Sequence, residues 1–329
     1  MKNKVIAAVI FLMFFVSVTA IVSLPAAAAE EEYIFVSCLG NIEYFNAHKY
    51  GWKRAGEVLG VKTTYMGPPD FDLAAMAATM DQAIVKQPKG IVMFGVDPSL
   101  DPSINKAVDA GIPVAVVIGD QPNSKRLTYV GSYQEDLGYL GGKKIAEAIG
   151  GKGKVAILTI PGFEQWDSRE KGFRKAFGEY PGIEVVAKGD TKADTVIAIK
   201  AGKDILTRFP DLAAFAGCDS TAAIGAATAV EEADLAGKVA VVGVDRNSDV
   251  LAKIRKGTIT GTVAQDDAAM SFWALLTLYY YNHYRPPLTS DIEKSGAKVE
   301  PTLIYTPANY VDKTNLEFYL EANKLYTDF

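Results

Sequence analysis

The chain has 329 residues, of which 49% are hydrophobic and 22% charged, and its formal net charge at pH 7 is −5. This composition is that of a globular protein of about two domains, and it excludes a disordered, collagen-like or coiled-coil chain. The mild acidity provides no basic face for nucleic acid. Two cysteines and two histidines leave little material for a disulfide framework, a metal site or acid–base catalysis.

The first thirty residues have the three-part pattern of a secretory signal. Lys2 and Lys4 precede an apolar run over residues 5–24, and residues 27–29 are alanines that offer the small side chains of a cleavage site. The run is about long enough to span a bilayer, so a retained anchor is the alternative. We expect cleavage near Ala29 and export of the mature chain to the periplasm.

In the mature chain, short apolar runs rich in valine and isoleucine alternate with longer segments of helical period. The runs expected to form strands are 33–39, 62–66, 90–96, 112–118, 154–160, 183–187, 212–216 and 238–244. The helical segments between them include 46–59, 73–86, 134–149, 168–179, 193–209 and 221–233. Strands that are apolar throughout and joined by helix-length crossovers are typical of a buried parallel sheet. The sequence therefore predicts an α/β protein.

Two such series follow one another, and they contain related segments. Residues 113–120 read PVAVVIGD in the first series, and residues 238–245 read KVAVVGVD in the second. We predict two similar doubly wound parallel-sheet lobes, joined by a hinge of several strands. The expected boundaries, after a signal peptide over 1–29, are 30–132 with 266–297 for the N-terminal lobe, and 133–265 with 298–329 for the C-terminal lobe.

Polar side chains follow many of the expected strands, at the edge where open parallel sheets bind ligands. The candidate ligand contacts at these strand ends are Asn41, Asp97, Asp120, Cys218, Asp219, Asp245 and Gln265. For Asp97 and Asp219 the alternative is capping of the helix that follows.

Aromatic and cationic side chains lie near the same strand ends. Tyr44, Phe45 and Trp166 offer flat faces for the C–H side of a sugar ring or polyol. Arg169 is expected in the first turn of a helix, where a cation opposes the helix dipole and requires an anion or ligand. A guanidinium beside carboxylates suits neighbouring hydroxyls, since each hydroxyl both donates and accepts. We therefore predict a site for a hydroxyl-rich small molecule.

Several segments in order along the chain are similar to a known family. These are 44–60, 107–116, 138–146, 169–173, 215–223, 241–245, 261–265 and the tail 303–315. They resemble the periplasmic solute-binding proteins of ABC importers, of the ribose/galactose-binding type (the type I periplasmic binding proteins). The resemblance covers essentially the whole mature chain.

The resemblance implies roles for individual residues. Arg169 is expected to bond sugar hydroxyls, Asp245 to accept their hydrogens, and Gln265 to lie at the hinge and reach the ligand. Tyr44 and Phe45 match the aromatic pair on the faces of the sugar ring. The chain departs from the family's pattern after the fourth strand, where only Asp120 remains, at Cys218 in place of the usual asparagine, and in the first-strand loop over residues 38–43. D-ribose itself is therefore not expected.

The predicted function is that of a receptor that captures a sugar or polyol between its lobes and delivers it to an ABC transporter permease in the inner membrane. We expect a monomer that uses no cofactor, metal or nucleic acid. An autoinducer-2 or nucleoside receptor of the same fold is the alternative, as is a sensor for a chemoreceptor or histidine kinase. An enzyme is not expected, since no phosphate-binding glycine motif follows a strand and no nucleophile elbow is present.

Overall fold

The computed structural model describes residues 31–40, 43–69 and 71–327. The expected signal with its cleavage site near Ala29, and the candidate contact Asn41, lie outside these residues. The chain from Glu31 onward forms one compact unit. Within the described ranges, no helix is long and apolar enough to cross a membrane.

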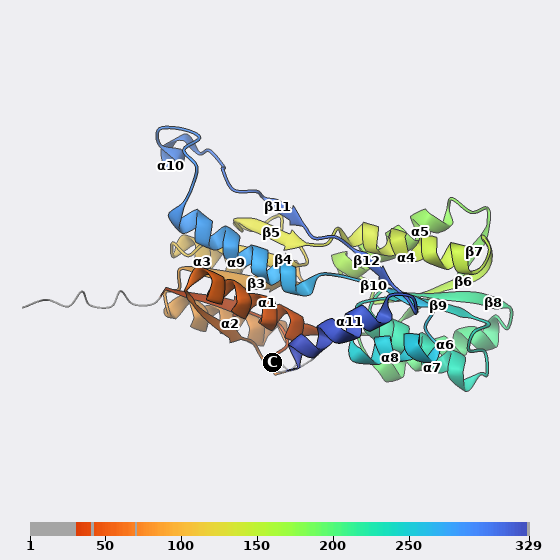
Figure 1. The fold of residues 1–329 in the computed structure, drawn as a ribbon. Helices are drawn as coiled ribbons and strands as arrows, with labels where there is room; N and C mark the ends of the chain where they lie inside the picture. The colour runs from red at the N-terminus through yellow and green to blue at the C-terminus, as the bar shows by residue number, and fades with distance from the viewer. Residues whose placement is uncertain (1–30, 41–42, 70, 328–329) are drawn as a thin grey trace, which may run out of the picture. The chain divides into compact units, whose positions relative to one another are not determined.

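Two six-stranded sheets organise this unit (Figure 1). The first sheet has the order β11-β5-β4-β3-β1-β2, with bounds Leu303–Tyr305, Thr128–Gly131, Val114–Ile118, Gly90–Gly95, Glu32–Val36 and Lys62–Met66. The second has the order β12-β10-β9-β8-β6-β7, with bounds Asn309–Val311, Gly261–Ala264, Ala240–Val244, Leu212–Gly217, Lys152–Thr159 and Gly182–Asp190. All neighbouring strands are parallel except β12, which pairs antiparallel with β10.

Helices cover both faces of each sheet. In the first lobe these are α1 (Tyr44–Leu59), α2 (Leu73–Val85), α3 (Asp101–Asp109) and α9 (Asp267–His283), with the short turn η1 (Pro98–Leu100). In the second lobe they are α4 (Gln134–Ala148), α5 (Glu164–Phe177), α6 (Thr195–Arg208), α7 (Ser220–Glu232), α8 (Ser248–Lys256), α11 (Leu316–Asn323) and η2 (Lys324–Tyr326). The helix α10 (Ile292–Ser295) lies between α9 and β11.

The helix pairings show the doubly wound arrangement directly. In the first lobe α1 packs with α9 and α2 packs with α3, and in the second α4 packs with α5 and α6 packs with α7. Central strands such as β3 and β4 are buried throughout, which is why they are apolar on both faces. The predicted fold class is confirmed.

The return of the chain differs in detail from the predicted lobe boundaries. Strand β11 pairs with β5 in the first sheet, with Leu303 opposite Tyr129, although residues 298–329 were assigned to the second lobe. The edge of β5 has free backbone groups, and the tail satisfies them before it crosses to β12. The chain thus passes between sheets three times, after β5, after β10 and after β11. The division into two domains remains a prediction.

Candidate ligand-binding site

A cavity of about 700 Å³ lies between the carboxyl ends of strands from the two sheets. The first lobe lines it with Cys38, Leu39, Tyr44, Phe45, Phe71, Phe94 and Ile118. The polar side chains that line it from the second lobe are Gln165, Arg169, Asp190, Lys192, Thr195, Asp219, Ser220, Thr221, Asp245 and Asn247. The cavity therefore lies where strand-end chemistry places a ligand in this fold class. We call this cavity the cleft.

Arg169 is the central cation of the cleft. Only 3% of the residue is exposed, its Nε donates to Gln134 Oε1 at 2.8 Å, and one terminal nitrogen donates to the carbonyl of Cys218 at 2.8 Å. Because α5 begins at Glu164, Arg169 lies in the second turn and not in the first turn as predicted. The helix dipole acts mainly on the first turn, so it matters less here than these acceptors. The two acceptors, Gln134 Oε1 and the Cys218 carbonyl, hold the planar guanidinium in one orientation.

Two buried carboxylates face the same cleft. Asp245 follows β9 with φ 78°, accepts from Gln265 Nε2 at 3.2 Å and from the backbone N–H of Ser220 at 3.3 Å. Asp219 caps α7 by accepting from the backbone N–H of Ala222 at 2.7 Å, and it also lines the cleft. Its capping role, offered above as the alternative, is therefore real and leaves its second oxygen for another partner.

Burial raises the pKa of both carboxyl groups, and the charge of a neighbouring carboxylate adds to the rise in each, Asp245 for Asp219 and Asp267 for Asp245. Desolvation, together with the charge of Asp245, raises the pKa of Asp219 to about 6, although the backbone N–H of Ala222 and the charge of Arg169 oppose the change. Desolvation also raises the pKa of Asp245, again opposed by Arg169. Two carboxylates around one guanidinium leave a surplus of acceptors, which donors on a ligand can satisfy.

Aromatic rings cover the cleft from both lobes. The rings of Tyr44 and Phe45 meet edge to face at 5.1 Å, and Phe45 meets Phe94 in the same way at 5.5 Å. On the opposite wall, Phe163 packs edge to face on Trp166 at 5.5 Å. The Trp166 Nε1 is buried and makes no hydrogen bond within the described chain, although it lies close enough to Asp219 to lower its pKa.

The structure brings eight of the residues predicted as contacts together at the cleft, two of them indirectly. Six of them line the cleft, namely Tyr44, Phe45, Trp166, Arg169, Asp219 and Asp245. Gln265 reaches the cleft only through its hydrogen bond to Asp245, and its buried Oε1 has no partner in the described chain. Cys218 contributes its backbone carbonyl to Arg169, while burial raises the pKa of its thiol to about 12.

Asp97 and Asp120 do not line the cleft. Asp97 caps η1 by accepting from the backbone N–H of Ser99 at 2.8 Å, which was the alternative given for it. The Arg126 guanidinium donates to both carboxylate oxygens of Asp120. Its Nε bonds Oδ1, and a terminal nitrogen bonds Oδ2 at 2.7 Å. Arg126, six residues further along the chain, therefore occupies both oxygens of this carboxylate.

The sequence analysis missed two groups of residues. Phe94 and Ile118 belong to apolar strands and were interpreted only as core. Asp190 and Lys192 were missed because β7 continues to Asp190, beyond the predicted end at residue 187. The polar run over residues 190–194 was the available signal for that strand end.

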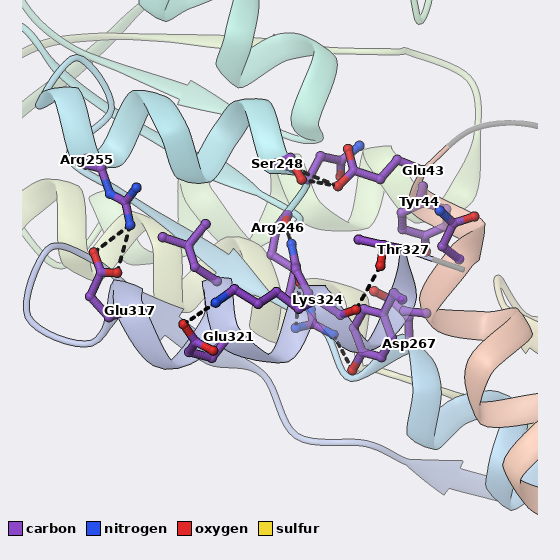
Figure 2. Close-up of a pocket in the computed structure, with 16 residues that line it drawn as sticks. Glu43, Tyr44, Arg246, Ser248, Arg255, Asp267, Glu317, Glu321, Lys324 and Thr327 are labelled. Atoms are coloured by element: carbon purple, nitrogen blue, oxygen red, sulfur yellow. Dashed lines mark hydrogen bonds and ion pairs between the residues drawn. The ribbon is translucent and has the colours of Figure 1, made fainter. Parts of the chain in front are cut away.

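A second cavity, of about 610 Å³, adjoins the cleft through Tyr44 and Asn247 (Figure 2). There the Glu43 carboxylate accepts from the hydroxyl of Ser248 and from its backbone N–H at 3.0 Å. The residue before α8, Asn247, makes no side-chain cap of its own. A carboxylate of the first lobe therefore caps a helix of the second. We call this contact the interlobe cap.

Comparison with known proteins identifies the class. The periplasmic binding protein domain model matches residues 33–282, and the chain belongs to that family. It is 27% identical to the D-allose-binding periplasmic protein of Escherichia coli (strain K12) over 290 residues, which are 85% of this chain and 89% of that protein. The family consists of binding proteins rather than enzymes.

Solved structures agree with this assignment. An arabinose binding protein from Geobacillus stearothermophilus superposes with a TM-score of 0.81 at 27% identity, covering 88% of this chain and 99% of that one. A sugar-binding protein of a sugar ABC transporter from Bacillus halodurans gives a TM-score of 0.83 at 28% identity, covering 88% of this chain and 100% of that one.

Proposed function

We propose that this protein captures a sugar or polyol in the cleft and delivers it to the permease of an ABC importer. The observation that carries the proposal is the buried group of Arg169, Asp219 and Asp245, set in a cavity that both lobes line. Such a group pairs with several hydroxyls at once. The similarity of the chain to a D-allose-binding protein and to an arabinose binding protein supports a carbohydrate as the ligand.

Closure of the lobes is the second part of the proposal. A ligand that touches both lobes binds the closed form more tightly than the open form, so it shifts the population toward closure. The family and the apolar N-terminal run together support a periplasmic location after cleavage near Ala29. We propose that the mature chain acts there as a monomer without enzymatic activity and meets its permease in the closed form.

A thermal-shift screen of the mature protein tests the function. The screen covers pentoses, hexoses, polyols, nucleosides and autoinducer-2, because a ligand of the folded state raises the melting temperature. We expect a carbohydrate or polyol to give the largest shift. Isothermal titration of Asp245→Ala then checks the site, and we expect loss of measurable binding with an unchanged circular dichroism spectrum. A shift produced only by nucleosides or amines would overturn the proposal.

A further inference from the structure

The two walls of the cleft differ in polarity. The second lobe lines it with the cations Arg169 and Lys192 and with the acidic side chains Asp190, Asp219 and Asp245. The first lobe lines it, in the ranges that the structure describes, with five purely apolar side chains, one thiol and one phenol. This wall therefore carries no charged side chain among the described residues.

Among the described residues, the first-lobe wall offers a ligand two side-chain heteroatoms, the sulfur of Cys38 and the phenol oxygen of Tyr44. Burial raises the pKa of the Cys38 thiol to about 12, so the sulfur stays protonated and is a poor hydrogen-bonding group. Burial raises the pKa of Tyr44 well above its ordinary value, with a contribution from the charge of Asp267, so its hydroxyl stays neutral and can serve one ligand hydroxyl at most as donor and acceptor. The acids that follow β3 and β4, Asp97 and Asp120, do not line the cleft, and Arg126 holds the carboxylate of Asp120.

Backbone strain marks the apolar wall at Ile118. This residue ends β4 with φ 76°, a left-handed conformation that is rare for a β-branched side chain. Its carbonyl accepts from the Tyr129 hydroxyl and from Gln134 Nε2, each at 2.8 Å, and these bonds hold the strained backbone in place. In the second lobe the same backbone conformation, with φ 78°, occurs at Asp245. The strained strand end is therefore occupied by an isoleucine, Ile118, in the first-lobe wall and by a carboxylate, Asp245, in the second-lobe wall.

We propose that the ligand is a monosaccharide or polyol with one apolar face, a deoxy or methyl-branched compound, whose hydroxyls meet the second lobe. This inference rests on the proposed function and specifies its ligand. A hydroxyl pressed against Phe94, Ile118 and Leu39 loses its bonds to water and gains none. A methyl or methylene group at the same place is buried favourably. The difference amounts to about tenfold in Kd for each hydroxyl so placed.

Isothermal titration with matched sugars tests the inference. The pairs are D-fucose with D-galactose, L-rhamnose with L-mannose, and 2-deoxy-D-ribose with D-ribose, with the deoxy counterpart of any other sugar found in the thermal screen. We expect the deoxy member of the best-binding pair to bind at least about tenfold more tightly. If the hydroxylated parent binds as tightly or more tightly in every pair that binds, the inference is wrong while the receptor function stands. If no sugar or polyol binds, both are wrong.

Two variants of the first-lobe wall test the cause. Ile118→Asn places an amide at the strained position, and asparagine tolerates the left-handed backbone. Leu39→Asn does the same at a half-buried position and serves if Ile118→Asn does not fold. Both are expected to shift the affinity ratio toward the hydroxylated parent by about tenfold. Val58→Asn is the control, because Val58 is exposed on α1 of the same lobe and does not line the cleft, so it should leave the ratio unchanged. An unchanged ratio in the folded first-lobe variants would overturn the assignment of the apolar face.

Discussion

Asp219 shows how the binding cleft lowers the stability of the ligand-free protein. Only 7% of the residue is exposed, and burial raises its pKa from an ordinary value of 3.8 to about 6. Because the folded-state pKa exceeds the unfolded one, the carboxyl favours folding at pH values below about 4, and this contribution is lost as the pH rises through about 6. The rise of about two pKa units corresponds to about 3 kcal/mol at pH 7.

The substitution Asp219→Asn removes this penalty and keeps the helix cap, since asparagine caps a helix as well as aspartate does. We expect the variant to be more stable than the wild type by up to about 3 kcal/mol at pH 7, and by under about 1 kcal/mol at pH 4. Urea unfolding of the ligand-free protein at both pH values measures the difference. The gain in stability should accompany a loss of ligand affinity, since the same carboxylate faces the cleft.

Asp194→Asn is the control for this experiment. Asp194 caps α6 by accepting from the backbone N–H of Ile197 at 2.9 Å, as Asp219 caps α7, but its side chain is exposed to water. We expect it to change stability by less than about 0.5 kcal/mol at either pH. The reasoning is refuted if Asp219→Asn gives the same change in stability at pH 4 as at pH 7.

Three further outcomes are expected. Arg169→Lys keeps the charge but loses the planar donors, so ligand binding should weaken by about tenfold or more. Arg169→Met leaves the buried carboxylates without a compensating charge, and it should lower the unfolding free energy by about 3–5 kcal/mol at pH 7. Glu43→Ala removes the interlobe cap and should speed ligand release about three- to tenfold in stopped-flow fluorescence, unlike Glu57→Ala on the exposed surface of α1, and equal rates would contradict this role. The thiols of Cys38 and Cys218, with pKa values of about 12, should react with a maleimide at pH 8 only after unfolding, and rapid labelling of the native protein would show that they are accessible.

Much of the site could be predicted from strand ends. Arg169, Asp219 and Asp245 were found because parallel strands deliver their carboxyl ends to a single edge, whatever the details of packing. Asp120 was predicted by the same reasoning and does not line the cleft, because the guanidinium of Arg126 competes for its carboxylate. The sequence of a single chain does not show which of several nearby donors will bond a carboxylate at a strand end.

The alternation of buried strands and crossover helices follows from periodicity and composition, which are local properties of the chain. The route of the tail is different, since β11 and β12 are three residues long each and carry too little local signal to choose a sheet. Their place is determined by the otherwise unpaired edges of β5 and β10, whose backbone groups pair with β11 and β12 respectively. The apolar wall with Phe94 and Ile118 is a product of packing in the same way. An apolar strand residue becomes part of a binding surface only when the second lobe faces it across a cavity, and that juxtaposition depends on contacts between residues far apart in the sequence.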